Sequence, residues 1–166
     1  MPVRPVLTLP HDVLVTPAYP VGAIGAEARA LAVDLVDTMN ASPGCVGLAA
    51  PQIGVDLRAF AVDVTGHRLA RSCHGIFVLF DPVVEAASTP ETAREGCMSV
   101  PDLTGNVARA TRVTVSGTTP DGDHCRLEVD AFEARAVLHE MDHLAGLVFL
   151  DRVAGPHDVF PRRVYR

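Results

Sequence analysis

Hydrophobic and polar positions follow a helical period in one part of the chain and form short strand-like runs elsewhere. Between residues 26 and 40 apolar side chains recur every three or four positions, which predicts one amphipathic helix with aspartates on its other side. Residues 57–64 and 76–84 are rich in valine, isoleucine and phenylalanine and predict two strands. Residues 112–117 and 125–129 flank a turn with Pro-Asp-Gly at its centre and therefore predict an antiparallel hairpin.

A second helix is predicted near the end of the chain. Asp130 has a glutamate three positions later, Glu133, and this spacing is typical of a capping box at the start of a helix. The helical pattern continues through Leu144, and Gly146 is placed to end it. Residues 155–166 show no period and predict an irregular basic tail. The order of elements is therefore mixed: helix, strands, helix.

The composition fits a single domain spanning residues 1–166, because 48% of the chain is hydrophobic and no segment resembles a linker or a repeat. The net charge of −6 is spread without a basic block, which argues against nucleic acid or an anionic membrane as a partner. The N-terminal segment lacks the apolar core of a secretory signal, and no stretch approaches the roughly 20 apolar residues of a membrane span. We therefore expect a cytoplasmic protein.

Two features of the composition narrow the chemistry. The four cysteines are widely spaced and form no C-x-x-C pair, so we expect free thiols and no disulfide framework. The sequence contains no lysine, which excludes a Schiff-base lysine and the lysine of a phosphate-binding loop. A thiol is therefore available as a metal ligand or a nucleophile.

The predicted second helix carries the sequence LHEMDHLAG, residues 138–146. His139 and His143 are four positions apart, so both side chains project from the same side of a helix and can bind one metal ion. Glu140 lies beside them and is placed to reach a water at that ion, as in the H-E-x-x-H motif. The same pattern also arises by chance, and the histidines are then ordinary core residues.

A hydrolytic site of this kind normally needs a third protein ligand. The extended metzincin pattern requires a histidine where this chain has Phe149, and no glutamate follows Glu140, so neither the metzincins nor the glutamate-type zinc proteases fit. The remaining choices are a cysteine upstream or one of three downstream side chains, Asp151, His157 and Asp158.

Two further segments contain glycine next to reactive side chains. In EGCMSVP, residues 95–101, Cys97 follows a glycine that lets the backbone approach a ligand. A thiolate beside two imidazoles forms a soft site suited to zinc or ferrous iron. In GCVGLAAPQIG, residues 44–54, Gln52 offers an amide donor for an oxyanion, although such a segment is often only a tight turn. The other three cysteines are interpreted as ordinary small thiols.

These segments, G-V-G-L-A-A-P-Q, E-G-C-M-S and H-E-M-D-H in this order, resemble the three motifs of the peptide deformylases, and the similarity covers most of the chain. The resemblance implies an α+β fold in which antiparallel strands surround a central helix carrying H-E-x-x-H. It also implies that Cys97, His139 and His143 bind the metal, with ferrous iron (Fe2+) usual in the family and zinc (Zn2+), nickel (Ni2+) or cobalt (Co2+) able to replace it. The implied reaction removes formyl from the formyl-methionine of new polypeptides and releases formate.

By the same resemblance, individual residues receive roles in this reaction. Glu140 takes a proton from the attacking water and later passes it to the leaving amine. Gln52 and the backbone N–H of Met98 hold the oxyanion. The substrate backbone pairs with the strand edge near Val46 and Gly47 by β-augmentation. The expected substrate-binding positions are Val46, Gly47, Gly96, Phe132 and Ala136.

Supporting roles and departures from the family pattern complete this prediction. Asp142 and Arg109 are expected to pair and brace the helix that carries the two histidines. Glu95 is expected either to orient the glycine-rich segment of residues 44–54 or to be solvated. Met98 stands where leucine is usual, which is tolerated because a backbone group acts there. The long C-terminal helix of some members is missing, which leaves the subclass and ribosome docking open.

The expected partner is a formylated nascent peptide or a small N-formyl substrate. A transient ribosome contact, no direct contact with nucleic acid and a monomeric state are also expected. Three other functions stay open at this point. They are a deformylase-like hydrolase of an N-acyl small molecule in specialised metabolism, a zinc endopeptidase with Asp151 or His157 as third ligand, and an inactive, metal-stabilised binding module.

Overall fold

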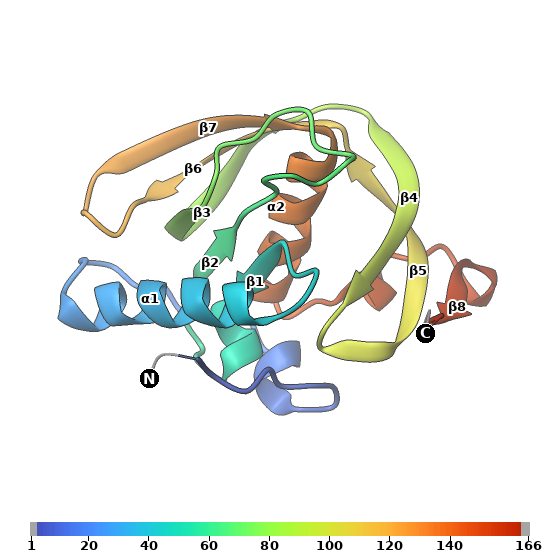
Figure 1. Cartoon of the computed structure of the whole chain (residues 1–166), viewed down its shortest axis with the longest axis horizontal. Helices are drawn as coiled ribbons and strands as arrows, with labels where there is room; N and C mark the ends of the chain where they lie inside the picture. The colour runs from blue at the N-terminus through green and yellow to red at the C-terminus, as the bar shows by residue number, and fades with distance from the viewer. Residues whose placement is uncertain (1–2, 164–166) are drawn as a thin grey trace.

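Helix α2 lies between two antiparallel sheets in the computed structural model, which describes residues 3–163 (Figure 1). The larger sheet has the strand order β1-β2-β3-β6-β7 and the smaller one the order β4-β5-β8. The predicted α+β class is therefore confirmed. The strands are β1 (Gly47–Ala49), β2 (Ala59–Val62), β3 (Phe77–Ala87), β4 (Pro90–Cys97), β5 (Val100–Ala110), β6 (Arg112–Thr118), β7 (His124–Asp130) and β8 (Val159–Pro161).

The elements with a clear hydrophobic period form where the sequence predicts them. Helix α1 (Ala26–Ala41) buries the predicted apolar side, and α2 (Ala131–Leu144) carries both histidines of the H-E-x-x-H motif. Strands β2 and β3 arise from the two predicted apolar runs, and β6 and β7 form the predicted hairpin. Short 3₁₀ helices occupy parts of the connections: η1 (Asp12–Val15), η2 (Ala50–Ile53), η3 (Phe149–Asp151) and η4 (Pro156–Asp158).

Helix α2 begins after Asp130 as predicted, but the predicted capping box is wrong. The Asp130 side chain caps no helical N–H; it accepts a hydrogen bond of 2.9 Å from the N–H of Ser72. Glu133 is fully buried and accepts hydrogen bonds from Ser72 Oγ and from His74. Both carboxylates thus accept hydrogen bonds from the loop before β3 and not from the N–H groups of the helix. They thereby link this loop to the first turn of α2. At its other end the helix stops before Gly146, whose φ of +79° favours glycine.

The smaller sheet is the part of the fold that the hydrophobic pattern did not predict. Strand β4 has mostly exposed side chains, so it lacks the alternation that indicates a half-buried strand. The predicted irregular tail is also wrong in part, because β8 pairs with Leu103–Gly105 of β5. This sheet matters for the site, since β4 ends at Cys97. No helix among the described residues is long and apolar enough to cross a membrane.

Candidate active site

Three side chains from two separate elements meet beside α2. Cys97 at the end of β4 joins His139 and His143 of α2, and their ligand atoms all lie within 4.8 Å of one another. The sulfur of Cys97 is 3.3 Å from His143 Nε2. The structure thus favours the upstream cysteine as third ligand, because none of the downstream candidates Asp151, His157 and Asp158 joins this group. Two of them have other partners: Asp151 accepts a hydrogen bond from the Val148 N–H, and Asp158 from Asn106.

Each of the two histidines has a property that suits a metal ligand. Nδ1 of His139 bonds to Glu95 Oε1 at 2.7 Å, which leaves Nε2 for a metal. Burial lowers the pKa of His143 well below its usual value, so this imidazole is neutral and can donate a lone pair. One thiolate and two imidazoles form a soft donor set that fits ferrous iron or zinc and leaves one coordination position for water or substrate.

Glu140 is a buried carboxylate without the partners that usually accompany one. It is 3% exposed, and its Oε2 has no hydrogen-bond partner among residues 3–163. Burial raises the pKa of Glu140 to about 7, because desolvation disfavours the charged form. The carboxylate lies over Gly47, where a Cβ would stand 2.6 Å from Glu140 Oε1. A group of this kind can accept and return a proton near neutral pH.

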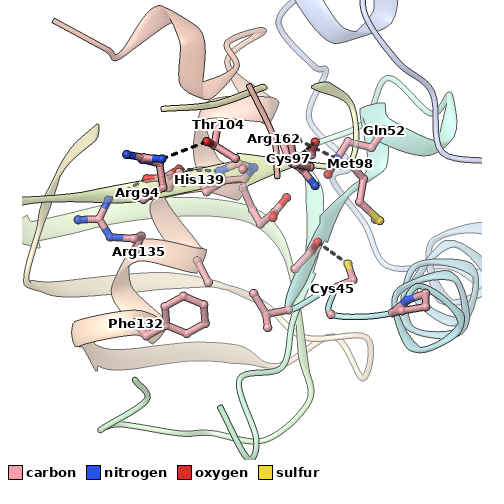
Figure 2. Close-up of a pocket in the computed structure, with 18 of the residues that line it drawn as sticks. Cys45, Gln52, Arg94, Cys97, Met98, Thr104, Phe132, Arg135, His139 and Arg162 are labelled. Atoms are coloured by element: carbon pink, nitrogen blue, oxygen red, sulfur yellow. Dashed lines mark hydrogen bonds and ion pairs between the residues drawn. The ribbon is translucent and has the colours of Figure 1, made fainter. Parts of the chain in front are cut away.

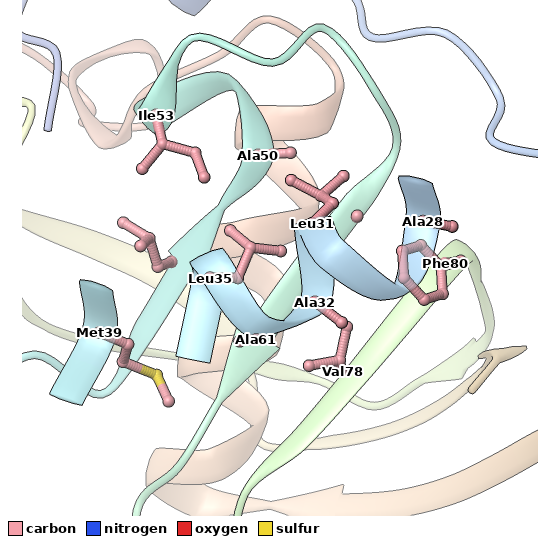
Figure 3. Packing of buried hydrophobic residues seen from close by; sticks show 12 residues of the cluster. Ala28, Leu31, Ala32, Leu35, Met39, Ala50, Ile53, Ala61, Val78 and Phe80 are labelled. Carbon is pink, nitrogen blue, oxygen red and sulfur yellow. The ribbon is translucent and has the colours of Figure 1, made fainter. Parts of the chain in front are cut away.

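Gln52 is held rigidly at the other side of the thiol. Its Oε1 accepts a hydrogen bond from the Ala49 N–H at 3.0 Å, so its amide nitrogen faces Ser99 Oγ at 3.1 Å and the Cys97 sulfur at 3.6 Å. Gln52 belongs to η2, which is anchored in the core beneath α1: Figure 3 shows Ala50 and Ile53 of η2 near Leu31, Leu35 and Met39 of α1. The predicted donor therefore stands in the site, and Ser99 is a partner that sequence analysis did not identify.

A buried ionic network fixes the ligands behind the site. Arg109, 5% exposed, donates to Glu95 at 2.8 Å and also bonds to Asp142, which confirms the predicted Arg109–Asp142 pair. Glu95 is neither solvated nor bonded to the glycine-rich segment; it accepts from His139, Arg109 and Arg135. Although desolvation opposes the charged form, His139 and Arg109 lower the pKa of Glu95 to about 2. Removing one member of such a network typically costs about 3–5 kcal/mol.

The remaining predicted residues line one pocket of about 460 Å³ in front of these groups (Figure 2). Phe132 is stacked on His67 with ring centres 3.7 Å apart, and the Cys45 thiol donates to the Gly47 carbonyl at 3.1 Å. Burial raises the pKa of Cys45 to about 11, so this thiol stays protonated. Predicted residues that line the pocket are Val46, Gly47, Gln52, Gly96, Cys97, Met98, Phe132, Ala136, His139 and Glu140.

Sequence analysis missed the arginines of this pocket. Arg94, Arg135, Arg162 and Arg163 line it, and Arg162 comes from the segment predicted as an irregular tail. No local pattern marks them, because β4, α2 and the residues after β8 meet only in the folded chain. The basic composition of residues 155–166 was the one available signal.

Comparison with known proteins gives consistent matches over nearly the whole chain. A family model described as polypeptide deformylase matches residues 3–158. A peptide deformylase of Acidothermus cellulolyticus is 41% identical over 153 residues, covering 92% of this chain and 80% of the relative. The crystal structure of peptide deformylase from Ehrlichia chaffeensis has a TM-score of 0.86 at 29% identity, covering 92% of this chain and 88% of that one. A Met-Ala-Ser-bound structure of a class I type b peptide deformylase from Acinetobacter baumannii has a TM-score of 0.82 at 31% identity, over 91% of this chain and 98% of that one.

Proposed function

The chain belongs to the polypeptide deformylase family, a family of metal-dependent hydrolases, and we propose that its Cys97, His139 and His143 centre releases formate from N-formylmethionyl polypeptides. The observation that carries this assignment is the meeting of one sulfur and two imidazole nitrogens within 4.8 Å. Ferrous iron is the proposed metal, and zinc, nickel and cobalt accept the same ligands. A metal ion held there supplies Lewis-acid catalysis and lowers the pKa of nearby water.

Glu140 is the proposed general base and general acid. Its carboxylate takes a proton from the water that attacks the formyl carbon, and it returns that proton to the methionine nitrogen as the C–N bond breaks. The products are formate and a free amino terminus. Support comes from its burial, its unpartnered Oε2 and a pKa raised to about 7, since these features keep the carboxylate ready to exchange a proton.

Oxyanion stabilisation is assigned to Gln52 Nε2 and to the backbone N–H of Met98. The hydrogen bond from Ala49 to Gln52 Oε1 supports this role, because it turns the amide nitrogen toward Cys97 and fixes it before substrate arrives. Such a preorganised donor needs no reorganisation when charge develops on the carbonyl oxygen, and losing one costs roughly 3 kcal/mol in barrier height.

The substrate backbone is proposed to pair with the outer edge of β1. In the part of the chain that the structure describes, β1 pairs with one strand, β2, and Gly47 of β1 faces Val62 of β2. Asp63 N–H donates to the Val46 carbonyl, so the ladder alternation directs the N–H and C=O of Gly47 away from β2. An extended peptide can add there as a strand. Val46, Phe132 and Ala136 then supply apolar contacts for the methionine side chain.

The rest of the proposal concerns context: one catalytic domain over residues 1–166, a monomer, a cytoplasmic location, no bound nucleic acid, and transient contact with the ribosome when the substrate emerges. The central test is anaerobic measurement of formate release from formyl-Met-Ala-Ser by iron-loaded protein. Turnover of this peptide with negligible turnover of acetyl-Met-Ala-Ser is the expected result. Failure to release formate from the formyl peptide would refute the assignment.

A further inference from the structure

Unpaired positive charge borders the pocket at one place. Arg94, Arg162 and Arg163, here called the cationic rim, line the pocket. Within residues 3–163 none of the three forms an ion pair with a carboxylate, whereas the fourth pocket arginine, Arg135, is paired with Glu95. The chain as a whole has a net charge of −6, so this concentration of positive charge does not follow from composition.

The smaller sheet brings two of these arginines to one face. Its register aligns Gly96, Thr104 and Phe160 in a row across β4, β5 and β8. Arg94 lies two positions before Gly96, and Arg162 lies two positions after Phe160. Because side chains alternate along strands, both arginines project from the same face as that row. Figure 2 shows Arg94 bonded to Thr104 and Arg162 beside Cys97.

Local contacts hold both guanidinium groups in place. Nη2 of Arg162 donates to the Cys97 carbonyl at 3.2 Å. A Cβ on Gly96 would lie only 2.6 Å from this nitrogen, so the absence of a side chain at position 96 makes room for the guanidinium group. Arg94 lies 3.8 Å from the ring centre of Phe160, and its Nε donates to Asn106 at 3.0 Å. Among the described residues, the bond to the Cys97 carbonyl is the one hydrogen bond that the Arg162 side chain makes, although a guanidinium has five N–H donors. The free donors are preorganised for an anion.

We propose that the cationic rim binds a substrate carboxylate located after the methionine, so that acidic formyl-peptides are preferred over neutral ones of the same length. The inference rests on the proposed function and specifies its substrate class. Arg162 contacts the backbone of Cys97, and the same pocket of about 460 Å³ includes Gly47 of the β1 edge, so a peptide that fills it passes close to the rim. Guanidinium groups bind carboxylates with two parallel hydrogen bonds, so arginine side chains suit the recognition of a substrate carboxylate.

The substrate carboxylate can be the C-terminal carboxylate or the side chain of an acidic residue, and two pairs of peptides distinguish these sources. Formyl-Met-Ala-Ser with a free C-terminus is compared with its C-terminal amide, and formyl-Met-Ala-Glu-amide with formyl-Met-Ala-Gln-amide. In at least one pair we expect kcat/KM to favour the acidic peptide by about twofold to fivefold at low salt, mainly through KM, as for one ion pair at a partly exposed site. The preference should shrink at 0.5 M salt, because screening weakens exposed charges.

Variants then locate the effect. Arg162→Gln should bring the ratio of acidic to neutral kcat/KM close to one, and Arg162→Lys should keep part of it. The ratio is informative even if a variant is less stable, because both peptides meet the same enzyme. Arg126→Gln is the matched control: Arg126 is exposed on β7, pairs with Glu85 and changes the net charge equally, so the preference should remain.

The outcomes distinguish this inference from the function on which it rests. Formate release with equal kcat/KM for both members of each pair overturns the cationic rim and leaves the proposed function intact. A preference that survives undiminished in Arg162→Gln also overturns it. Absence of formate release from all four peptides overturns both. A preference confined to one pair supports the rim and identifies the C-terminal or the side-chain carboxylate as its ligand.

Discussion

Replacing Gly47 by alanine tests whether the Glu140 carboxylate must stand where it does. A Cβ on residue 47 would lie 2.6 Å from Glu140 Oε1 and 3.1 Å from the carboxyl carbon. Restoring an ordinary contact of 3.4 Å moves the carboxylate by about 0.8 Å. Displacing a reacting group by about 1 Å can cost about 100-fold in rate. We therefore expect kcat for formate release to fall by about 30-fold to 100-fold while the bound metal stays in place.

The assay is steady-state formate release with iron-loaded protein, with metal content measured on the same samples. Gly155→Ala is the control, because a Cβ there meets nothing within 4 Å and its backbone is extended, so activity should be unchanged. A double-mutant cycle adds a stricter test: in a Glu140→Gln background, Gly47→Ala should cause no further loss. A Gly47→Ala variant with kcat within twofold of the parent enzyme would refute the reasoning.

Three other changes separate metal binding from proton transfer. Cys97→Ala should reduce the metal content from about one ion per chain to a small fraction of that, since two imidazoles alone bind it weakly; unchanged content by elemental analysis would exclude Cys97 as a ligand. Glu140→Ala should retain the metal but slow formate release by at least about 100-fold, and a loss below tenfold would remove Glu140 from proton transfer. Glu95→Gln should weaken metal affinity by about 10-fold to 100-fold in chelator competition, because His139 loses its charged partner. In urea the same variant should unfold with a free energy lower by about 3 kcal/mol, because Arg109 becomes partly unpaired, and an unchanged midpoint would contradict that.

The residues that sequence analysis placed correctly belong to local patterns or to the family motifs. His139 and His143 share one side of α2 because a spacing of four positions does so in any helix. Strands β5, β6 and β7 lie between Cys97 and these histidines in the sequence. Periodicity alone therefore left several candidates for the third ligand open. Resemblance to a known family selected Cys97, and the fold then brought its sulfur to 3.3 Å from His143.

The residues that were misjudged depend on contacts between distant segments. Glu133 has the spacing of a capping residue, yet its carboxylate binds Ser72 and His74, 61 and 59 positions away. Arg162 approaches Cys97 across 65 positions because β8 pairs with β5. Neither strand of that pair has the strong apolar alternation from which strands are inferred. Long-range pairing of weakly patterned strands was therefore the limit of prediction here.

The electrostatic surroundings of two glutamates fit the two roles proposed for them, in which one orients a metal ligand and the other moves a proton. Glu95 receives hydrogen bonds from His139, Arg109 and Arg135, and its pKa is lowered to about 2, so it stays ionised and keeps His139 oriented. Glu140 is buried as deeply but receives no such hydrogen bonds within residues 3–163, and burial raises its pKa to about 7. Two carboxylates whose pKa values are driven apart by their environments take different roles. The difference between the two glutamates therefore comes from their hydrogen-bond donors and their burial, since the two side chains are chemically identical.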